Sequence, residues 1–153
     1  MYILPRKCLY IFEAVLYIAL NSKARAVSLK EVCGAVGVKV RYLEQAMQQL
    51  VHSGILRGVR GPRGGYLLAK ERRKLTLGEI FDVMDTYSLD LTEDAAWSKM
   101  AGEAIRPMAD EIKQKMRQEL MQITIEDLCA KIEISHKSAA KTKTSAKTSD
   151  FTI

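Results

Sequence analysis

The sequence predicts a mainly α-helical fold with one small β-hairpin. Three stretches have the pattern of a capping box, in which a hydroxyl residue starts a helix and an acidic residue follows three positions later. They are Ser28-x-x-Glu31, Thr76-x-x-Glu79 and Thr124-x-x-Asp127. Between the first two, residues 55–60 and 66–68 are expected to form two short strands, and they flank residues 61–65, Gly-Pro-Arg-Gly-Gly, a composition typical of a hairpin turn.

Three helices are expected before the hairpin. The first runs from about Pro5 to Leu20, and its apolar stripe consists of Cys8, Phe12, Val15 and Ala19. The second runs from Leu29 to Val36 and the third from about Val40 to His52, with Gly37 supplying the tight turn between them. The side chains that the third should bury are Leu43, Met47, Leu50 and Val51. Gly54 then ends this helix in a left-handed conformation.

Three more helices are expected after the hairpin. A short one runs from Leu75 to Asp85, and residues 86–106 show no clear pattern. Pro107 is expected to open a long helix that ends near Met121, because proline suits the first turn of a helix and breaks the interior of one. The last helix is expected over residues 124–134.

The chain therefore divides into three parts. Residues 1–85 hold the first helices and the hairpin, and residues 86–134 hold a linker and the long helices. Residues 135–153 are rich in Lys, Ser, Thr and Ala and have almost no large apolar side chain, so this basic tail is expected to be disordered.

The net charge of +6 hides a strong asymmetry along the chain. Residues 1–74 carry 14 basic and 4 acidic side chains, whereas residues 75–135 carry 6 basic and 13 acidic ones. A basic half of this kind attracts a polyanion. Nucleic acid is the expected partner, because no basic amphipathic helix flanked by aromatic residues, the signature of membrane-surface binding, is evident.

Several other classes of protein are disfavoured. No apolar run approaches the roughly 18 residues of a membrane span, and no signal-peptide pattern is evident at the start, so a cytoplasmic location is expected. The three cysteines, Cys8, Cys33 and Cys129, are too far apart in the sequence for a disulfide framework or a zinc site. With two histidines and no glycine-rich phosphate loop, the chain is not expected to be an enzyme.

Two helices joined through Gly37 and followed by a basic hairpin are typical of a winged helix-turn-helix, which binds double-stranded DNA. Residues 40–52 would lie in the major groove, and the wing, residues 57–66, would contact the minor groove or phosphates. The candidate contacts at the start of the recognition helix are Lys39, Arg41, Tyr42, Glu44 and Gln45. Those on the wing are Arg57, Arg60 and Arg63, of which Arg63 at the tip is the strongest candidate.

Six runs of residues carry a family resemblance. They are 40–45 (VRYLEQ), 53–56 (SGIL), 59–69 (VRGPRGGYLLA), 75–80 (LTLGEI), 106–107 (RP) and 123–128 (ITIEDL). From about residue 4 to 134 the chain resembles the Rrf2 family of bacterial transcription regulators. The resemblance implies a homodimer on a roughly palindromic operator, in which the helix near Pro107 crosses its partner. With the basic half, the helix pair and the arginine wing, the expected function is that of a repressor of transcription. The residues expected at the dimer contact are Met108, Ile112, Met116 and Leu120.

The sequence departs from the family pattern in two places. Many members bind an iron-sulfur cluster through three cysteines just before the dimer helix, but the stretch from Thr86 to Arg106 has no cysteine and no histidine. The resemblance therefore points to the cluster-free branch, without a cofactor, whose members sense a metabolite, a partner enzyme or the modification of a thiol. Lys39 also stands where a serine cap is usual, at a cost of roughly 1 kcal/mol.

Other interpretations stay open at this point. The chain could be an interaction module that acts mainly through a partner enzyme, or a regulator that senses through a thiol or unusual metal ligands. Cys8 and Cys33 are expected to pack as small core residues, whereas a redox role for Cys129 stays open. Trp97 is expected to pack, with an effector pocket as its alternative role.

Overall fold

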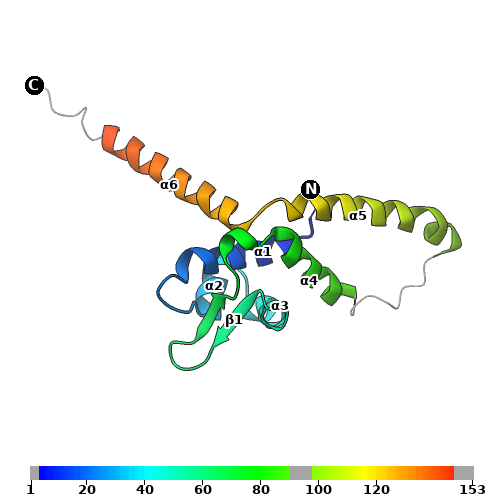
Figure 1. The fold of residues 1–153 in the computed structure, drawn as a ribbon, viewed down its shortest axis with the longest axis horizontal. Coiled ribbons are helices and arrows are strands. Elements are labelled where there is room, and N and C mark those ends of the chain that lie inside the picture. The colour runs from blue at the N-terminus through cyan, green and yellow to red at the C-terminus, as the bar shows by residue number, and fades with distance from the viewer. Residues whose placement is uncertain (1–3, 90–97, 147–153) are drawn as a thin grey trace, which may run out of the picture.

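The computed structural model describes residues 4–89 and 98–146 (Figure 1). Its α-helices are α1 (Arg6–Asn21), α2 (Leu29–Val36), α3 (Val40–His52), α4 (Leu77–Leu89), α5 (Arg106–Met121) and α6 (Ile125–Ala146). Strands β1 (Leu56–Val59) and β2 (Gly65–Leu68) form a two-stranded antiparallel sheet. The predicted mainly helical fold with a small hairpin is confirmed. No helix in the described part of the chain is both long and apolar enough to span a bilayer.

Helix α1 lies at the centre of the core because one of its faces is entirely apolar. Its residues Ile11, Val15 and Ile18 are completely buried, and the helix packs against α2, β2, α4 and α6. The predicted stripe of Cys8, Phe12, Val15 and Ala19 is buried. In Figure 1, α5 and α6 extend from opposite sides of this core, while the hairpin projects from it next to α3.

Local signals set the ends of α2 and α3 where the sequence predicts them. The Glu31 amide donates to Ser28 Oγ at 3.2 Å at the start of α2, and Gly37 ends this helix with a φ of 77°. The Glu31 carboxylate is taken up elsewhere, since it pairs with Arg25 at 2.8 Å. Lys39 is the N-cap of α3 and makes no side-chain capping hydrogen bond.

Two backbone hydrogen bonds attach the wing to the helical core. The Val27 amide donates to the Tyr66 carbonyl at 3.0 Å, and the Tyr66 amide donates to the Val27 carbonyl at 2.8 Å. At the neighbouring Gly65 a side chain would collide with the Val27 backbone. The close approach of the two backbones, and with it the position of the wing, therefore depends on glycine at residue 65.

The starts of α4 and α6 are joined by a short β-bridge between Thr76 and Thr124. The Leu77 amide donates to the Ile123 carbonyl, and the Ile125 amide donates to the Leu75 carbonyl, each at 2.9 Å. Both predicted capping boxes form here. The Glu79 amide donates to Thr76 Oγ1 at 3.2 Å and the Asp127 amide donates to Thr124 Oγ1 at 3.1 Å.

Pro107 lies in the first turn of α5, which begins at Arg106, as expected, but the chain before this helix is itself helical, which was not predicted. Residues 99–100 are already helical, and Ala101–Ile105 form a π-helical turn that continues directly into α5. The Arg106 amide donates to the Ala101 carbonyl, five residues back. Proline lacks an amide hydrogen and its ring clashes with a regular helical turn before it, and the wider π turn relieves both conflicts.

Two helix ends and one further element also differ from the prediction. Helix α4 continues past Asp85 to Leu89, and a 3-10 turn over Arg72–Lys74 was not predicted. Helix α6 continues past residue 134 to Ala146, so residues 135–146 are helical where disorder was expected. This segment contains Ala and Lys, which favour helix, and neither Gly nor Pro. Trp97 and the end of the tail, residues 147–153, lie outside the described residues.

Glycine at residue 65 is predicted to be essential for the attachment of the wing. We expect Gly65→Ala to lower the free energy of unfolding by about 2 kcal/mol or more, because the added methyl meets backbone that cannot move freely. Gly58→Ala is the matched control, since a Cβ there meets open space. Urea unfolding of the two variants measures the difference, and equal stability would contradict the close approach.

The capping box of α4 is predicted to make stability depend on pH. The Glu79 carboxylate accepts from the Thr76 amide at 3.0 Å and from Lys70 at 2.7 Å. Burial opposes its ionisation, but these hydrogen bonds lower its pKa below the ordinary 4.5. Its stabilisation is therefore complete above pH 4.5 and is lost as the pH falls through the lowered folded-state pKa.

The test is urea unfolding over a pH series, in which Glu79→Gln should flatten the acid limb of the stability curve. Glu119→Gln, which changes an exposed carboxylate on α5, is the matched control and should follow the wild type. A Glu79→Gln variant that keeps the full pH dependence would exclude this role of the cap.

Candidate nucleic-acid interface

The start of α3 exposes one polar and aromatic face. The five predicted contacts Lys39, Arg41, Tyr42, Glu44 and Gln45 are all exposed there, and so is Val40. The opposite face of the helix, which includes Leu43 and Met47, is buried in the core. Arg41 Nη2 donates to the Tyr42 hydroxyl at 3.1 Å, and the guanidinium lies 5.0 Å from the centre of the Tyr42 ring. The two side chains therefore form an ordered pair on the outer surface of α3.

The wing exposes its three arginines, as predicted. Arg57 lies on β1, while Arg60 and Arg63 lie in the turn between β1 and β2. The turn follows a tight path, because a side chain at Gly64 would collide with the Val59 carbonyl. Arg63 at its tip is exposed.

The cations of this surface differ from those behind it in their pairing. Lys70 pairs with Glu79 at 2.7 Å, Arg72 with Glu126 at 2.9 Å, and Arg73 and Lys74 both pair with Glu71. Within residues 4–89 and 98–146, by contrast, ion pairs are absent for Lys39, Arg41, Arg57, Arg60 and Arg63. The start of α3 and the wing thus present positive charge that no carboxylate of the described residues neutralises.

A hollow of about 620 Å³ beside the wing adds two cations that the sequence analysis missed. Lys23 and Arg25, from the loop after α1, line it together with Arg57 and Arg63. Arg25 is held by Glu31, whereas the Lys23 side chain is exposed. The sequence does show two basic residues in the loop directly before the helix-turn-helix, which could have marked them as candidate contacts. Their position beside the wing, however, depends on the fold.

The predicted dimer stripe of α5 has two different environments. Met108 is 50% exposed and Ile112 is 54% exposed, whereas Met116 packs against the core and Leu120 is only 6% exposed. The end of the stripe is held on α4, where Arg117 donates to Asp82 at 2.6 and 2.7 Å and Lys113 pairs with Asp85 at 2.6 Å. Leu120 therefore belongs to the core of its own chain, and the exposed apolar surface of α5 lies toward its start.

Comparison with known proteins identifies the family. Residues 4–131 match the family model Rrf2, which is described as an iron-dependent transcriptional regulator. The chain belongs to the Rrf2 family. The resemblance predicted from the wing and helix motifs is thus confirmed.

Relatives within the Rrf2 family include proteins named IscR. The HTH-type transcriptional regulator IscR of Escherichia coli (strain K12 / DH10B) is 39% identical over 89 residues, which are 58% of this chain. The match spans 54% of that relative, so the chain covers about half the length of the curated relatives it matches. These relatives are transcriptional regulators rather than enzymes, in agreement with the prediction.

Solved structures resemble the chain over most of its length. The IscR of T. potens is 26% identical, with a TM-score of 0.66, and the match covers 88% of this chain and 90% of that one. CymR (YrzC), described as the global cysteine regulator of B. subtilis, is 25% identical, with a TM-score of 0.64, over 85% of this chain and 98% of that one. Both support the winged helical fold of an Rrf2 protein.

The cysteines of this Rrf2 chain do not fit an iron-sulfur cluster. Cys8, Cys33 and Cys129 lie on α1, α2 and α6, and all three are buried. In the part of the chain that the structure describes, no three His, Cys, Asp or Glu side chains are grouped to hold a metal. Burial raises the pKa of each thiol, and at Cys129 the neighbouring Arg72 opposes this only in part. Such thiols are poor metal ligands and poor nucleophiles.

Proposed function

We propose that the chain is a dimeric, sequence-specific DNA-binding regulator of transcription that acts as a repressor in the bacterial cytoplasm. The observation that carries this proposal is the surface shared by α3 and the wing, where five exposed cations have no carboxylate partner among the described residues. Membership of a family of transcriptional regulators supports it. Residues 1–85 would form the DNA-binding part, and the helices that follow would carry the dimer contact.

Unpaired cations suit a DNA backbone because no ion pair of the protein must break before a phosphate binds. Each phosphate that such a cation neutralises releases condensed counterions, which favours binding at low salt. Arg57, Arg60 and Arg63 are proposed to contact phosphates or the minor groove, with Lys23 beside them at the hollow. These contacts fix the position of the protein on the duplex and carry little sequence information.

Sequence readout is proposed for the start of α3, residues 40–52, in the major groove. Arginine can fork onto the O6 and N7 atoms of guanine, glutamine onto adenine, and glutamate can accept from the amino group of cytosine. Arg41, Gln45 and Glu44 are the matching side chains, and all three are exposed on one helical surface. Lys39 and Tyr42 flank them and are proposed to contact the adjacent backbone.

A second copy of the chain is the proposed partner of the exposed part of α5. Met108 and Ile112 lie one helical turn apart, and Ile105 on the preceding turn is 50% exposed. Burying this surface between two copies would bring two winged domains to a roughly palindromic operator. Met116 would contribute at the edge of the contact, whereas Leu120 stays in the core of its own chain.

No cluster is proposed for this regulator, because its three thiols are buried on three different helices. The signal it senses is therefore expected to reach it in another form, through a small molecule or a partner protein.

The wing arginines are predicted to supply salt-dependent affinity. In a gel-shift titration with a duplex selected from a random pool, the double variant Arg60→Ala, Arg63→Ala should bind all sequences more weakly. The slope of log K against log salt should become shallower by roughly 0.9 for each phosphate that the protein no longer neutralises. Lys115→Ala, on the exposed surface of α5, is the control and should bind like the wild type. Unchanged affinity in the double variant would remove the wing from the interface.

The start of α5 is predicted to hold the dimer together. Ile112→Glu places a charge in the proposed contact, so light scattering should find monomers at micromolar concentration where the wild type is dimeric. Gln114→Glu adds the same charge two residues further along, on another side of α5, and should leave the dimer intact. Far-ultraviolet circular dichroism checks that both variants are folded. A dimeric Ile112→Glu variant would exclude this contact.

A further inference from the structure

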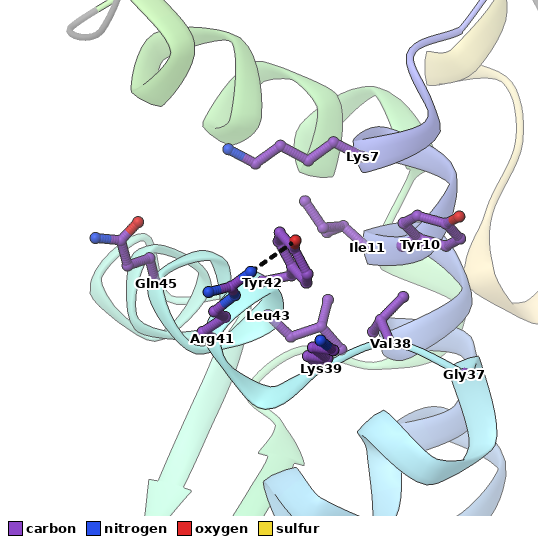
Figure 2. A pocket seen from close by; sticks show the side chains of 10 residues that line it. All are labelled: Lys7, Tyr10, Ile11, Gly37, Val38, Lys39, Arg41, Tyr42, Leu43 and Gln45. Atoms are coloured by element: carbon purple, nitrogen blue, oxygen red, sulfur yellow. Dashed lines mark hydrogen bonds between the residues drawn. The ribbon is translucent and has the colours of Figure 1, made fainter.

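A pocket of about 570 Å³ lies between the start of α1 and the start of α3 (Figure 2). Small-molecule sites usually enclose about 300 to 1,000 Å³, so the pocket is large enough for a ligand of moderate size. Two of its side chains, Lys7 and Tyr10, come from α1 and have no part in the DNA contacts proposed above. The others come from α1, from the turn before α3 and from the first turns of α3 itself.

Positive charge converges on the pocket from both helices. Lys7 extends from α1 above Tyr42, while Lys39 and Arg41 approach from the start of α3 (Figure 2). None of the described side chains that line the pocket is acidic. Lys39 and Arg41 form no ion pair among the described residues, so their positive charge favours an anion in the pocket.

The walls of the pocket are apolar and aromatic. Ile11 and Leu43 are almost fully buried and close its inner side, next to the half-buried Val38. Tyr42 is 56% exposed, yet its ring is ordered by the hydrogen bond and the cation–π contact with Arg41. A ring that is fixed before a ligand arrives loses little entropy on binding. These walls suit a ligand with a flat, apolar body.

We propose that this pocket binds a small aromatic carboxylate, and that this ligand and DNA exclude each other. The inference rests on the proposed function, because Lys39, Arg41 and Tyr42 belong both to the pocket and to the surface assigned to DNA. A ligand seated between α1 and α3 covers these side chains, so they are not available to a duplex. By thermodynamic linkage, DNA weakens the ligand as much as the ligand weakens DNA.

The probe for this site is 1-naphthoate, a flat aromatic carboxylate, and 1-naphthylmethanol is its uncharged counterpart. Binding of each to the free protein is measured by fluorescence titration. Release of a fluorescent duplex, selected from a random pool with the wild-type protein, is followed by anisotropy as the probe is added. The variant is Lys7→Gln, and Lys30→Gln on the exposed surface of α2 is the charge-matched control. Thermal melting checks that both are folded.

We expect 1-naphthoate to bind the free protein and to release the duplex. Removal of one charge-assisted hydrogen bond should weaken 1-naphthoate about tenfold in Lys7→Gln, and 1-naphthylmethanol should bind the wild type about tenfold more weakly than 1-naphthoate. Lys30→Gln should match the wild type in both measurements.

Three results would overturn the inference. The first is that 1-naphthoate does not bind the free protein at millimolar concentration. The second is that 1-naphthoate and 1-naphthylmethanol bind equally well, or that 1-naphthoate binds the wild type and Lys7→Gln equally well. The third is that 1-naphthoate binds but does not release the duplex. A wild-type protein that retains no duplex from the pool would instead refute the proposed function. The titration of the free protein still decides whether the anion site exists, so the two failures can be told apart.

Discussion

The bridge between Thr76 and Thr124 fixes the starts of α4 and α6 relative to each other. Two backbone hydrogen bonds of 2.9 Å join the segments on either side of it, and each threonine also caps a helix. At Gly78, on the first turn of α4, an added side chain would lie 2.6 Å from the Met121 side chain at the end of α5. Three helix ends therefore meet at one point. Since α4 packs against α1 and α3, this point sets the direction in which α5 leaves them, and in the proposed dimer it would set the spacing of the two copies of α3.

Charge is distributed so that the two proposed surfaces do not compete. Acidic side chains of α4 are used within the chain, where Asp82 and Asp85 hold Arg117 and Lys113 of α5. The cations of α3 and the wing, by contrast, lack such partners in the described residues. Exposed ion pairs contribute little to stability, so leaving these cations unpaired costs the fold almost nothing. They remain free to interact with a polyanion, and the net charge of the whole chain conceals this separation.

The parts of the fold that the sequence predicted are those set by local chemistry. Ser28, Gly37 and Gly54 each act through their own backbone neighbourhood, so the bounds of α2 and α3 were predicted correctly. The π turn before Pro107 was missed because a proline is accommodated either at the start of a helix or after a wider helical turn, and the sequence looks the same in both cases. Leu120 and Ile112 are both aliphatic and lie on the same stripe of α5, so the sequence does not distinguish them. Leu120 is buried and Ile112 exposed because α4 packs against the end of α5. Lys7 and Lys23 were missed because distant segments meet there.

Lys39 is a residue at which helix stability and the two proposed ligands make opposite demands. At the N-cap of α3 it gives up a capping hydrogen bond that serine would provide, and it adds a cation between the DNA surface and the pocket beside α1. Regulation through shared residues needs no second conformation of the protein, since a ligand that occupies the cations removes them from the duplex directly. The coupling is then limited by the contacts that both ligands use, rather than by the energy difference between two folded states. In the proposed scheme the ligand acts on the DNA contacts without an iron-sulfur cluster and without a change of fold.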